Sequence, residues 1–174
     1  GWYYLLVAEG GTSWGHAVTV ARSRTLTGPY EADPAGPVLT SRDHPLDPLQ
    51  KAGHASIVEA PGAGWYMAHL CARPIARKGR CTLGRETAIQ KVSWTDDGWL
   101  RVGPVPGRAA VEVEVSGLPA HPWPVPPVRE DFNSSQLPLD FQTLRIPLEL
   151  DTLSLEERPG FLRLKGRETI ASRH

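Results

Sequence analysis

The chain repeats one strand-and-turn pattern, and this repeat limits its fold more than any other feature. The tripeptide Gly-Trp-Tyr at residues 1–3 returns 63 positions later at residues 64–66, and each copy opens an apolar strand. A second β-rich stretch follows in each half, at residues 17–23 and 87–95, with starts 70 positions apart. A period of this length, built from short strands, predicts consecutive blades of a β-propeller. An antiparallel sandwich would contain strands of the same kind, so the repeat favours the propeller without excluding the sandwich.

The rest of the chain also indicates short strands joined by turns. The 17 glycines and 17 prolines favour many turns over long helices. Residues 32–51 show little periodicity and are expected to form a loop. An aromatic and β-branched run predicts a strand at residues 2–8, and alternation of apolar and polar residues predicts strands at residues 16–22 and 161–165. A short strand is expected to end near residues 30 and 31. Further strands are expected at residues 54–59, 65–70, 87–95 and 111–115.

Composition changes sharply after residue 103. Seven prolines lie between positions 104 and 127, which predicts an extended connector with little helix. A new alternating pattern begins near residue 130. We therefore expect the end of a propeller in residues 1–103, a Pro-rich linker in residues 104–129, and the start of a second β domain in residues 130–174. So short a second part is not expected to close a stable core alone.

Charge and hydropathy exclude two classes of partner. The 19 basic and 19 acidic side chains cancel, and no basic stripe is available for a phosphate backbone, so nucleic acid is not expected. No apolar run approaches the roughly 18 residues that cross a bilayer. The first residues read as a strand already in progress, so we expect an internal segment of a longer protein. Cys71 and Cys81 leave one disulfide or two free thiols open.

Several long stretches carry a specific resemblance. Residues 3–31, 50–70 and 83–100 resemble the last third of the catalytic domain of glycoside hydrolase family 43, in particular its β-xylosidases. Residues 131–148 and 158–170 resemble the start of the concanavalin A-like β-sandwich that follows this domain. The resemblance implies an all-β chain, a partial five-bladed β-propeller followed by the beginning of a β-sandwich.

The resemblance also implies an activity. The family removes terminal xylose or arabinofuranose with inversion, which needs a general acid and a general base roughly 6.5–9.5 Å apart. In the family, these carboxylates and a third acidic residue that tunes the acid all precede the position of Gly1. No catalytic residue is therefore expected here, Glu9 included, and the chain alone should be inactive. The resemblance further implies a xylo-oligosaccharide or arabinofuranoside substrate, a cytoplasmic location and a homo-oligomeric complete enzyme.

Three residues match binding positions of the family. Arg85, in LGRETAIQ, resembles a pocket arginine that donates hydrogen bonds to sugar hydroxyls; its alternative is an ion pair with Glu86 or another surface acid. Thr12, in EGGT, resembles a pocket-lining residue; its alternative is a turn hydroxyl bonded to backbone. His54, in AGHA, resembles a central histidine that contacts a Ca²⁺ ion otherwise held by water. The alternative for His54 is a hydrogen-bonded histidine that positions the acidic residues, and no other cofactor is expected.

Other conspicuous residues have simpler structural interpretations. His16 and His69 are expected to be strand residues rather than metal ligands, and Arg167 is expected to be structural. Asp96-Asp97-Gly98 is typical of a hairpin turn. Four tryptophans could stack on sugar faces, but three of them occupy equivalent repeat positions, where packing between blades is the simpler explanation; the four are Trp14, Trp65, Trp94 and Trp99.

Two rival functions stay open at this stage. The first is an α-L-arabinofuranosidase of the same family, because the residues that separate the two sugars lie mostly outside this chain. The second is a non-catalytic carbohydrate-binding β module. Neighbouring coding sequence would discriminate, since an upstream Glu-Gly-Pro motif and two earlier Asp motifs would support the enzyme.

Overall fold

The computed structural model describes residues 1–143, 147, 149 and 151–166. The chain divides into two compact units, Gly1–Ala120 and His121–His174. The described residues form strands and turns only, which confirms the expected all-β class. No described segment forms a helix long and apolar enough to cross a membrane.

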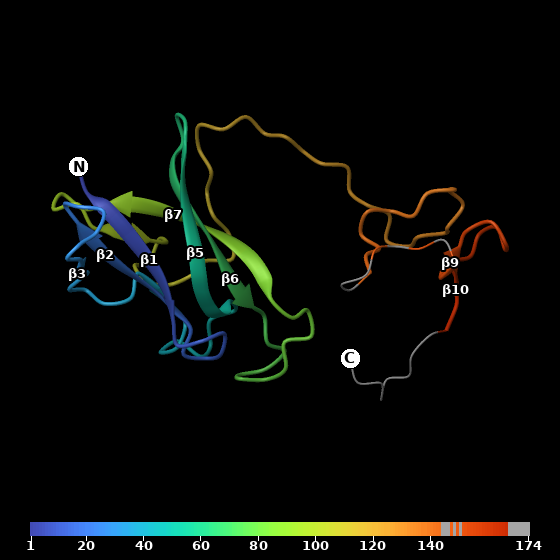
Figure 1. Ribbon diagram of the computed structural model, residues 1–174, viewed down its shortest axis with the longest axis horizontal. Coiled ribbons are helices and arrows are strands. Elements are labelled where there is room, and N and C mark those ends of the chain that lie inside the picture. Colours follow the sequence, from blue (N-terminus) through green and yellow to red (C-terminus); the bar gives the residue numbers. More distant parts are fainter. Residues whose placement is uncertain (144–146, 148, 150, 167–174) are drawn as a thin grey trace. The chain divides into compact units, whose positions relative to one another are not determined.

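The first sheet of the first unit is built on one long hairpin (Figure 1). β1 (Tyr3–Glu9) pairs antiparallel with β2 (Ala17–Ser23) in an unbroken register from Tyr3↔Ser23 to Glu9↔Ala17. The other edge of β2 is covered in two pieces, β3 (Glu31–Ala32) and β4 (Leu39–Thr40). β3 begins where a short strand is expected to end, near residues 30 and 31, whereas β4 lies in the region expected to be loop. Both short strands pair with β2, and together with β1 and β2 they form a four-stranded sheet.

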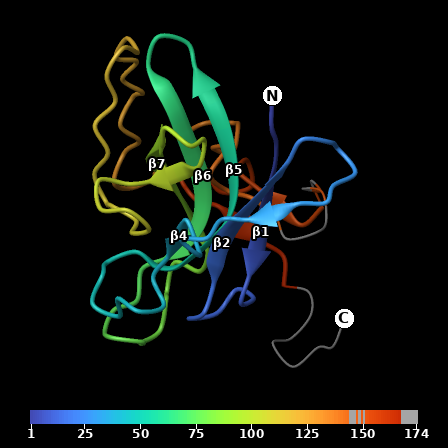
Figure 2. The same cartoon turned by 90° about the vertical axis from the view of Figure 1, so that its left-hand side faces the viewer.

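The second sheet is a four-stranded antiparallel meander. Its strands follow one another in chain order: β5 (Gln50–Ala60), β6 (Gly64–Ala72), β7 (Glu86–Trp94) and β8 (Leu100–Val102). β1 and β2 both contact β5, so the two sheets lie side by side (Figures 1 and 2). An antiparallel sheet beside a four-stranded meander is what consecutive propeller blades predict.

The core lies between the two sheets. Val18 and Leu39 of the first sheet and Met67 and Leu100 of the second are fully buried. The packing around them is tightened by three predicted structural tryptophans. Trp65 and Trp94 meet edge to face with ring centroids 5.5 Å apart, and Trp99 is buried beneath the Arg22 guanidinium, 3.9 Å from its ring centroid. The predicted packing role of these tryptophans is confirmed.

Both sheets also carry exposed apolar side chains on the face turned away from this core. On β1, Tyr3, Leu5 and Val7 alternate with inward-facing residues and are 37–48% exposed. On the second sheet, Val58 and Ile89 are 60% and 54% exposed. A sheet that is apolar on both faces is suited to burial between neighbouring sheets, as in a propeller ring.

The Pro-rich region differs from a uniform linker. The first compact unit extends to Ala120, whereas composition places the boundary at residue 103. The reason is a contact made by a buried side chain: Gln90 on β7 accepts a hydrogen bond from the Ala110 amide and donates one to the Ala110 carbonyl, both at 2.9 Å. Residues 111–115 form no strand, so that prediction is wrong.

The second unit contains a small antiparallel pair among its described residues. β9 (Leu153–Ser154) pairs with β10 (Arg163–Leu164), and β10 lies inside the strand predicted at residues 161–165. The rings of Phe132 and Phe141 meet at 5.4 Å between centroids. Arg167, expected to be structural, lies outside the described residues.

His69 gives the first unit a predictable response to pH. The side chain lies fully buried on β6, and this burial lowers the pKa of its imidazole; a hydrogen bond to the Leu70 carbonyl opposes the shift and nearby His16 adds to it. Below the ordinary histidine pKa of about 6.5, the unfolded chain therefore binds more protons than the folded one. The stability that neutral His69 contributes is complete above that pH and is lost as the pH falls below it.

We therefore expect the free energy of unfolding to drop between about pH 7.5 and about pH 5.5, and the drop to shrink in His69→Gln. Urea unfolding at the two pH values measures both. The same substitution at exposed His121 should leave the drop unchanged. Equal drops in the wild type and His69→Gln would contradict the assignment.

Candidate functional site

The three candidate binding residues lie in loops or at strand ends. Thr12 lies in the turn between β1 and β2, His54 near the start of β5, and Arg85 immediately before β7. All three side chains are exposed. Each of the three residues lies in or beside a paired strand. Their relative positions therefore follow from the strand registers.

The strand registers bring these residues to the same end of the two sheets. Gly53 pairs with Leu70, and Leu70 pairs with Thr87, so these residues form one row across β5, β6 and β7. His54 adjoins the first member of this row and Arg85 lies two positions before the last. Neighbouring strands lie about 4.8 Å apart, so the row spans about 10 Å. The Thr12 turn reaches the same end, because its last residue, His16, is hydrogen-bonded to Lys51 at the start of β5.

The turn that carries Thr12 depends on Gly10. Gly10 has φ +70°, and a Cβ there would lie only 2.1 Å from the Gly15 carbonyl oxygen. Gly11 has a similar φ, +60°, but open space around its Cα. Within the described residues the Thr12 hydroxyl makes no hydrogen bond, so the backbone-bonded alternative for Thr12 is not formed.

Alanine substitutions at Gly10 and Gly11 should separate the free-energy cost of close packing from the cost of the left-handed backbone conformation. Gly11→Ala should cost about 1–2 kcal/mol for the left-handed conformation alone. Gly10→Ala should cost about 1–3 kcal/mol more, because its Cβ must displace backbone. Denaturant unfolding of the two variants measures the difference, and equal losses would show that the turn opens without cost.

His54 lies within a bulged stretch of β5. The pairing with β6 slips between Gln50 and Gly53 and again between Gly53 and Ala55. Lys51 and His54 both have left-handed backbones, with φ of 55° and 52°. A bulge bends its strand and re-aims side chains, and such bulges recur beside active sites. The bulge therefore directs His54 out of the regular alternation of β5.

Arg85 is not paired with Glu86, the partner its alternative interpretation named. Glu86 instead accepts hydrogen bonds from Arg73, at 2.6 Å to Nη2 and 3.0 Å to Nε, across the loop that joins β6 to β7. The Arg73 guanidinium lowers the pKa of the Glu86 carboxyl, through these hydrogen bonds first. Within the described part of the chain, Arg85 forms no ion pair. Its guanidinium is available to a ligand.

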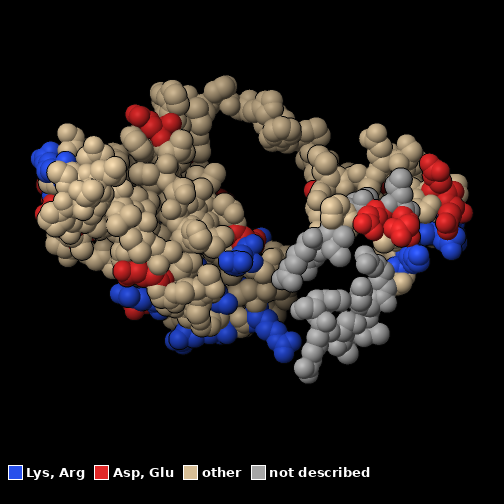
Figure 3. Space-filling model, viewed as in Figure 1, with Lys and Arg blue, Asp and Glu red and all other residues tan. Residues whose placement is uncertain are grey.

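The β6–β7 loop is strongly basic, which sequence reasoning missed. Five exposed cations lie between positions 73 and 85, and Figure 3 shows Lys and Arg gathered around and below the end of β6. The five are Arg73, Arg77, Lys78, Arg80 and Arg85. The zero net charge of the chain hid this local excess, which a windowed charge count would have found. The loop gives the site end of the second sheet a positive potential.

A calcium ion contacted by His54 and otherwise held by water stays a prediction. Ca²⁺ prefers six to eight oxygen ligands, usually with carboxylates among them. The described residues contain no group of three or more His, Cys, Asp or Glu side chains that could hold a metal. His54 supplies one exposed nitrogen, so no step in the function is assigned to a metal at this position.

Trp14 lies at the same end as the candidate residues. Its ring faces the Lys51 ammonium, 4.7 Å from the ring centroid, and its side chain is only partly buried. Cys71 and Cys81, both within the described residues, are free thiols. His16 and His69 are buried and bind backbone carbonyls, as expected for structural residues rather than metal ligands.

Comparison with known proteins identifies the family. Residues 1–100 match the model of glycosyl hydrolases family 43, and residues 129–174 match the beta xylosidase C-terminal concanavalin A-like domain. The chain belongs to glycosyl hydrolases family 43. Its first unit is therefore part of the family's β-propeller, and its second is the beginning of the β-sandwich that follows.

Individual relatives agree with this assignment. The chain is 47% identical to a xylan 1,3-beta-xylosidase of a Vibrio species over 99% of its length, and 41% identical to the non-reducing end alpha-L-arabinofuranosidase BoGH43B of Bacteroides ovatus over 95%. The crystal structure of xylan beta-1,4-xylosidase from Bacillus halodurans C-125 superposes with a TM-score of 0.90 at 53% identity, covering 99% of the chain. The chain spans 34%, 31% and 33% of these three proteins, about a third of each.

Proposed function

We propose that this chain is part of an exo-acting, inverting β-xylosidase that releases terminal xylose from xylo-oligosaccharides. The observation that carries the proposal is the convergence of Thr12, His54 and Arg85 at one end of two adjacent family 43 blades. Two of the three relatives described above are named as xylosidases. Sugar hydroxyls at this end would meet a hydroxyl, an imidazole and a guanidinium.

In this proposal the chain binds and orients the sugar. The Arg85 guanidinium has fixed planar donors that suit adjacent hydroxyls, and its positive charge favours the ionised form of nearby carboxylates. The general acid, the general base and the third acidic residue belong to the part of the enzyme that this chain does not span. Inversion requires the two reacting carboxyls to stand roughly 6.5–9.5 Å apart so that water can attack from the opposite side.

The test is an assay of the complete reading frame on nitrophenyl β-xyloside and on xylobiose, with the anomer of the first product followed by NMR. The proposal predicts release of xylose in the α configuration from the β-linked substrate. Release of the β anomer would exclude inversion. No turnover of either substrate would exclude a xylosidase.

The second candidate is an α-L-arabinofuranosidase, favoured by the named activity of the Bacteroides relative. Paired nitrophenyl xyloside and arabinofuranoside assays separate the two functions through the ratio of their kcat/KM values. A protein inactive on both that still binds xylo-oligosaccharide would be the non-catalytic carbohydrate-binding module. The cytoplasmic location and the homo-oligomeric state stay predictions, which fractionation of the source cells and sedimentation of the complete protein would test.

A further inference from the structure

The bulged segment Lys51–His54 at the start of β5 is contacted by the buried side chain of His16. The His16 Nδ1 atom lies 3.0 Å from the Lys51 carbonyl oxygen, and the side chain is almost fully buried. Because a carbonyl only accepts, Nδ1 carries the proton in this contact. One of the two left-handed residues of the bulge is thus bonded directly to the turn between β1 and β2.

The same imidazole also packs against the residue that precedes His54. A Cβ on Gly53 would lie 2.4–2.5 Å from Cδ2, Cγ and Nε2 of His16, which no real Cβ can do. Only glycine therefore allows the ring to approach the β5 backbone this closely. His16 therefore contacts the two residues that flank Ala52: it donates a hydrogen bond to the Lys51 carbonyl and packs against Gly53.

Further contacts hold His16 and the bulge. The Thr40 hydroxyl donates to the His16 carbonyl at 2.8 Å, and the Ala52 amide donates to the Ser41 hydroxyl at 3.2 Å. Both hydroxyls belong to the segment at β4. The first bond holds the His16 backbone and the second holds the bulge itself, both from the first sheet.

The bulge needs such support because its backbone is strained. Non-glycine residues in the left-handed region cost about 1–3 kcal/mol each and persist only where the surroundings determine them. Lys51 and His54 both occupy this region, at φ 55° and 52°. Without the His16 contact, β5 could relax toward regular pairing with β6, and one slip in register turns a side chain to the opposite face.

We propose that His16 is a positioning residue that sets the direction of the His54 side chain through the bulged segment Lys51–His54. This role rests on the proposed function insofar as His54 faces the sugar. The structural half, the dependence of the bulge on His16, stands independently of any activity. The two halves are therefore tested by separate readouts.

The kinetic test is a double-mutant cycle in the complete enzyme. His16→Phe keeps a ring but loses the donor, and should lower kcat/KM on nitrophenyl xyloside about 10- to 100-fold, as small misplacements of site groups do. His16→Asn, whose amide nitrogen can occupy the place of Nδ1, should recover most of this loss. In a His54→Ala background the additional effect of His16→Phe should disappear, because the two residues act as one unit. His121→Phe, at an exposed histidine, should leave kcat/KM unchanged.

The structural test is a crystal structure of the His16→Phe variant, with the doubly substituted His16→Ala, Gly53→Ala protein as a second variant should the first not fold. Loss of the positive φ at Lys51 or His54 supports the proposal even if the enzyme proves inactive on xylosides. A bulge unchanged in either variant overturns it. Equal fold-losses from His16→Phe with and without His54 would overturn the coupling, while an absence of all glycosidase activity in the wild type would count against the proposed function alone.

Discussion

Replacing Arg85 by alanine in the complete enzyme should lower kcat/KM on nitrophenyl xyloside about 10- to 100-fold, with most of the change in KM. Hydrogen bonds to a charged group contribute about 1.5–3 kcal/mol when their partner is otherwise left unpaired, which corresponds to that range. Arg85 has no competing ion pair within the described residues, since Glu86 is held by Arg73. The loss should therefore come from the substrate contact itself. Steady-state kinetics on the purified variant measure it.

Arg80 provides the matched control. It is an exposed arginine in the same loop, five positions earlier, and it lies outside the strand row that brings Arg85 toward His54. Arg80→Ala removes the same charge and should leave kcat/KM within about twofold of the wild type. Similar losses in both variants would assign the effect to the overall potential of the loop. An unchanged Arg85→Ala would remove Arg85 from the pocket.

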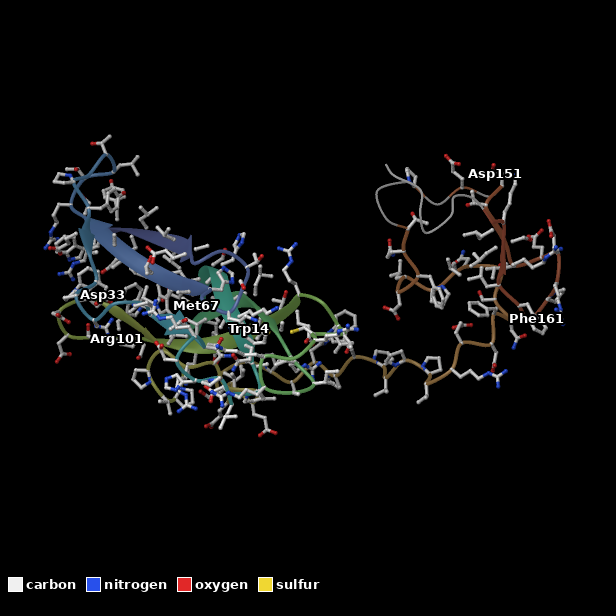
Figure 4. All side chains as sticks on the ribbon, turned by 90° about the horizontal axis from the view of Figure 1, so that it is seen from below. Trp14, Asp33, Met67, Arg101, Asp151 and Phe161 are labelled. Atoms are coloured by element: carbon white, nitrogen blue, oxygen red, sulfur yellow. The ribbon has the colours of Figure 1, made fainter. Side chains whose placement is uncertain are left out.

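Asp33→Ala should destabilise the first unit by about 3–5 kcal/mol, because it leaves a partly buried charge without its partner. The Asp33 carboxylate is 1% exposed and accepts two hydrogen bonds from the Arg101 guanidinium, the shorter at 2.5 Å (Figure 4). It also accepts one from the Ala35 amide at 2.9 Å. The pair joins the β3–β4 loop of the first sheet to β8 of the second. Its loss should lower the urea midpoint of the protein.

Asp43→Ala is the comparison for this ion pair. Asp43 bonds Arg42 at 3.1 Å, but both side chains are about half or more exposed. Exposed pairs of this kind contribute about 0–1 kcal/mol, so the midpoint should barely move. A change for Asp33→Ala as small as that for Asp43→Ala would show that water replaces Asp33 at Arg101 without cost.

The strands of the two blades could be predicted from the sequence because alternation and turn residues are local features of the chain. Alternation and turn residues predicted β1, β2, β6 and β7 to within one or two residues at each end. β5 is longer than expected, since its first residues, from Gln50, are bulged and carry no alternation. The strand expected at residues 111–115 is absent, and the residue before it, Ala110, is held by the Gln90 side chain across 20 positions.

The candidate site was only partly predictable for the same reason. Motif resemblance named Thr12, His54 and Arg85, but only the pairing of β5, β6 and β7 brings the last two toward one end. The sequence predicts only a strand residue at His16, because nothing in its local sequence reveals that it packs on Gly53, 37 positions later. The ion pair of Arg73 with Glu86 spans 13 positions and is equally invisible to periodicity.

The central claim is that His54 and Arg85 face one bound sugar. A crystal structure of the complete protein with xylobiose tests this directly. We expect the terminal xylose within about 3.5 Å of the Arg85 guanidinium, with the His54 imidazole lining the same pocket. Xylobiose bound elsewhere on the propeller, with Arg85 and His54 facing bulk water, would contradict the account.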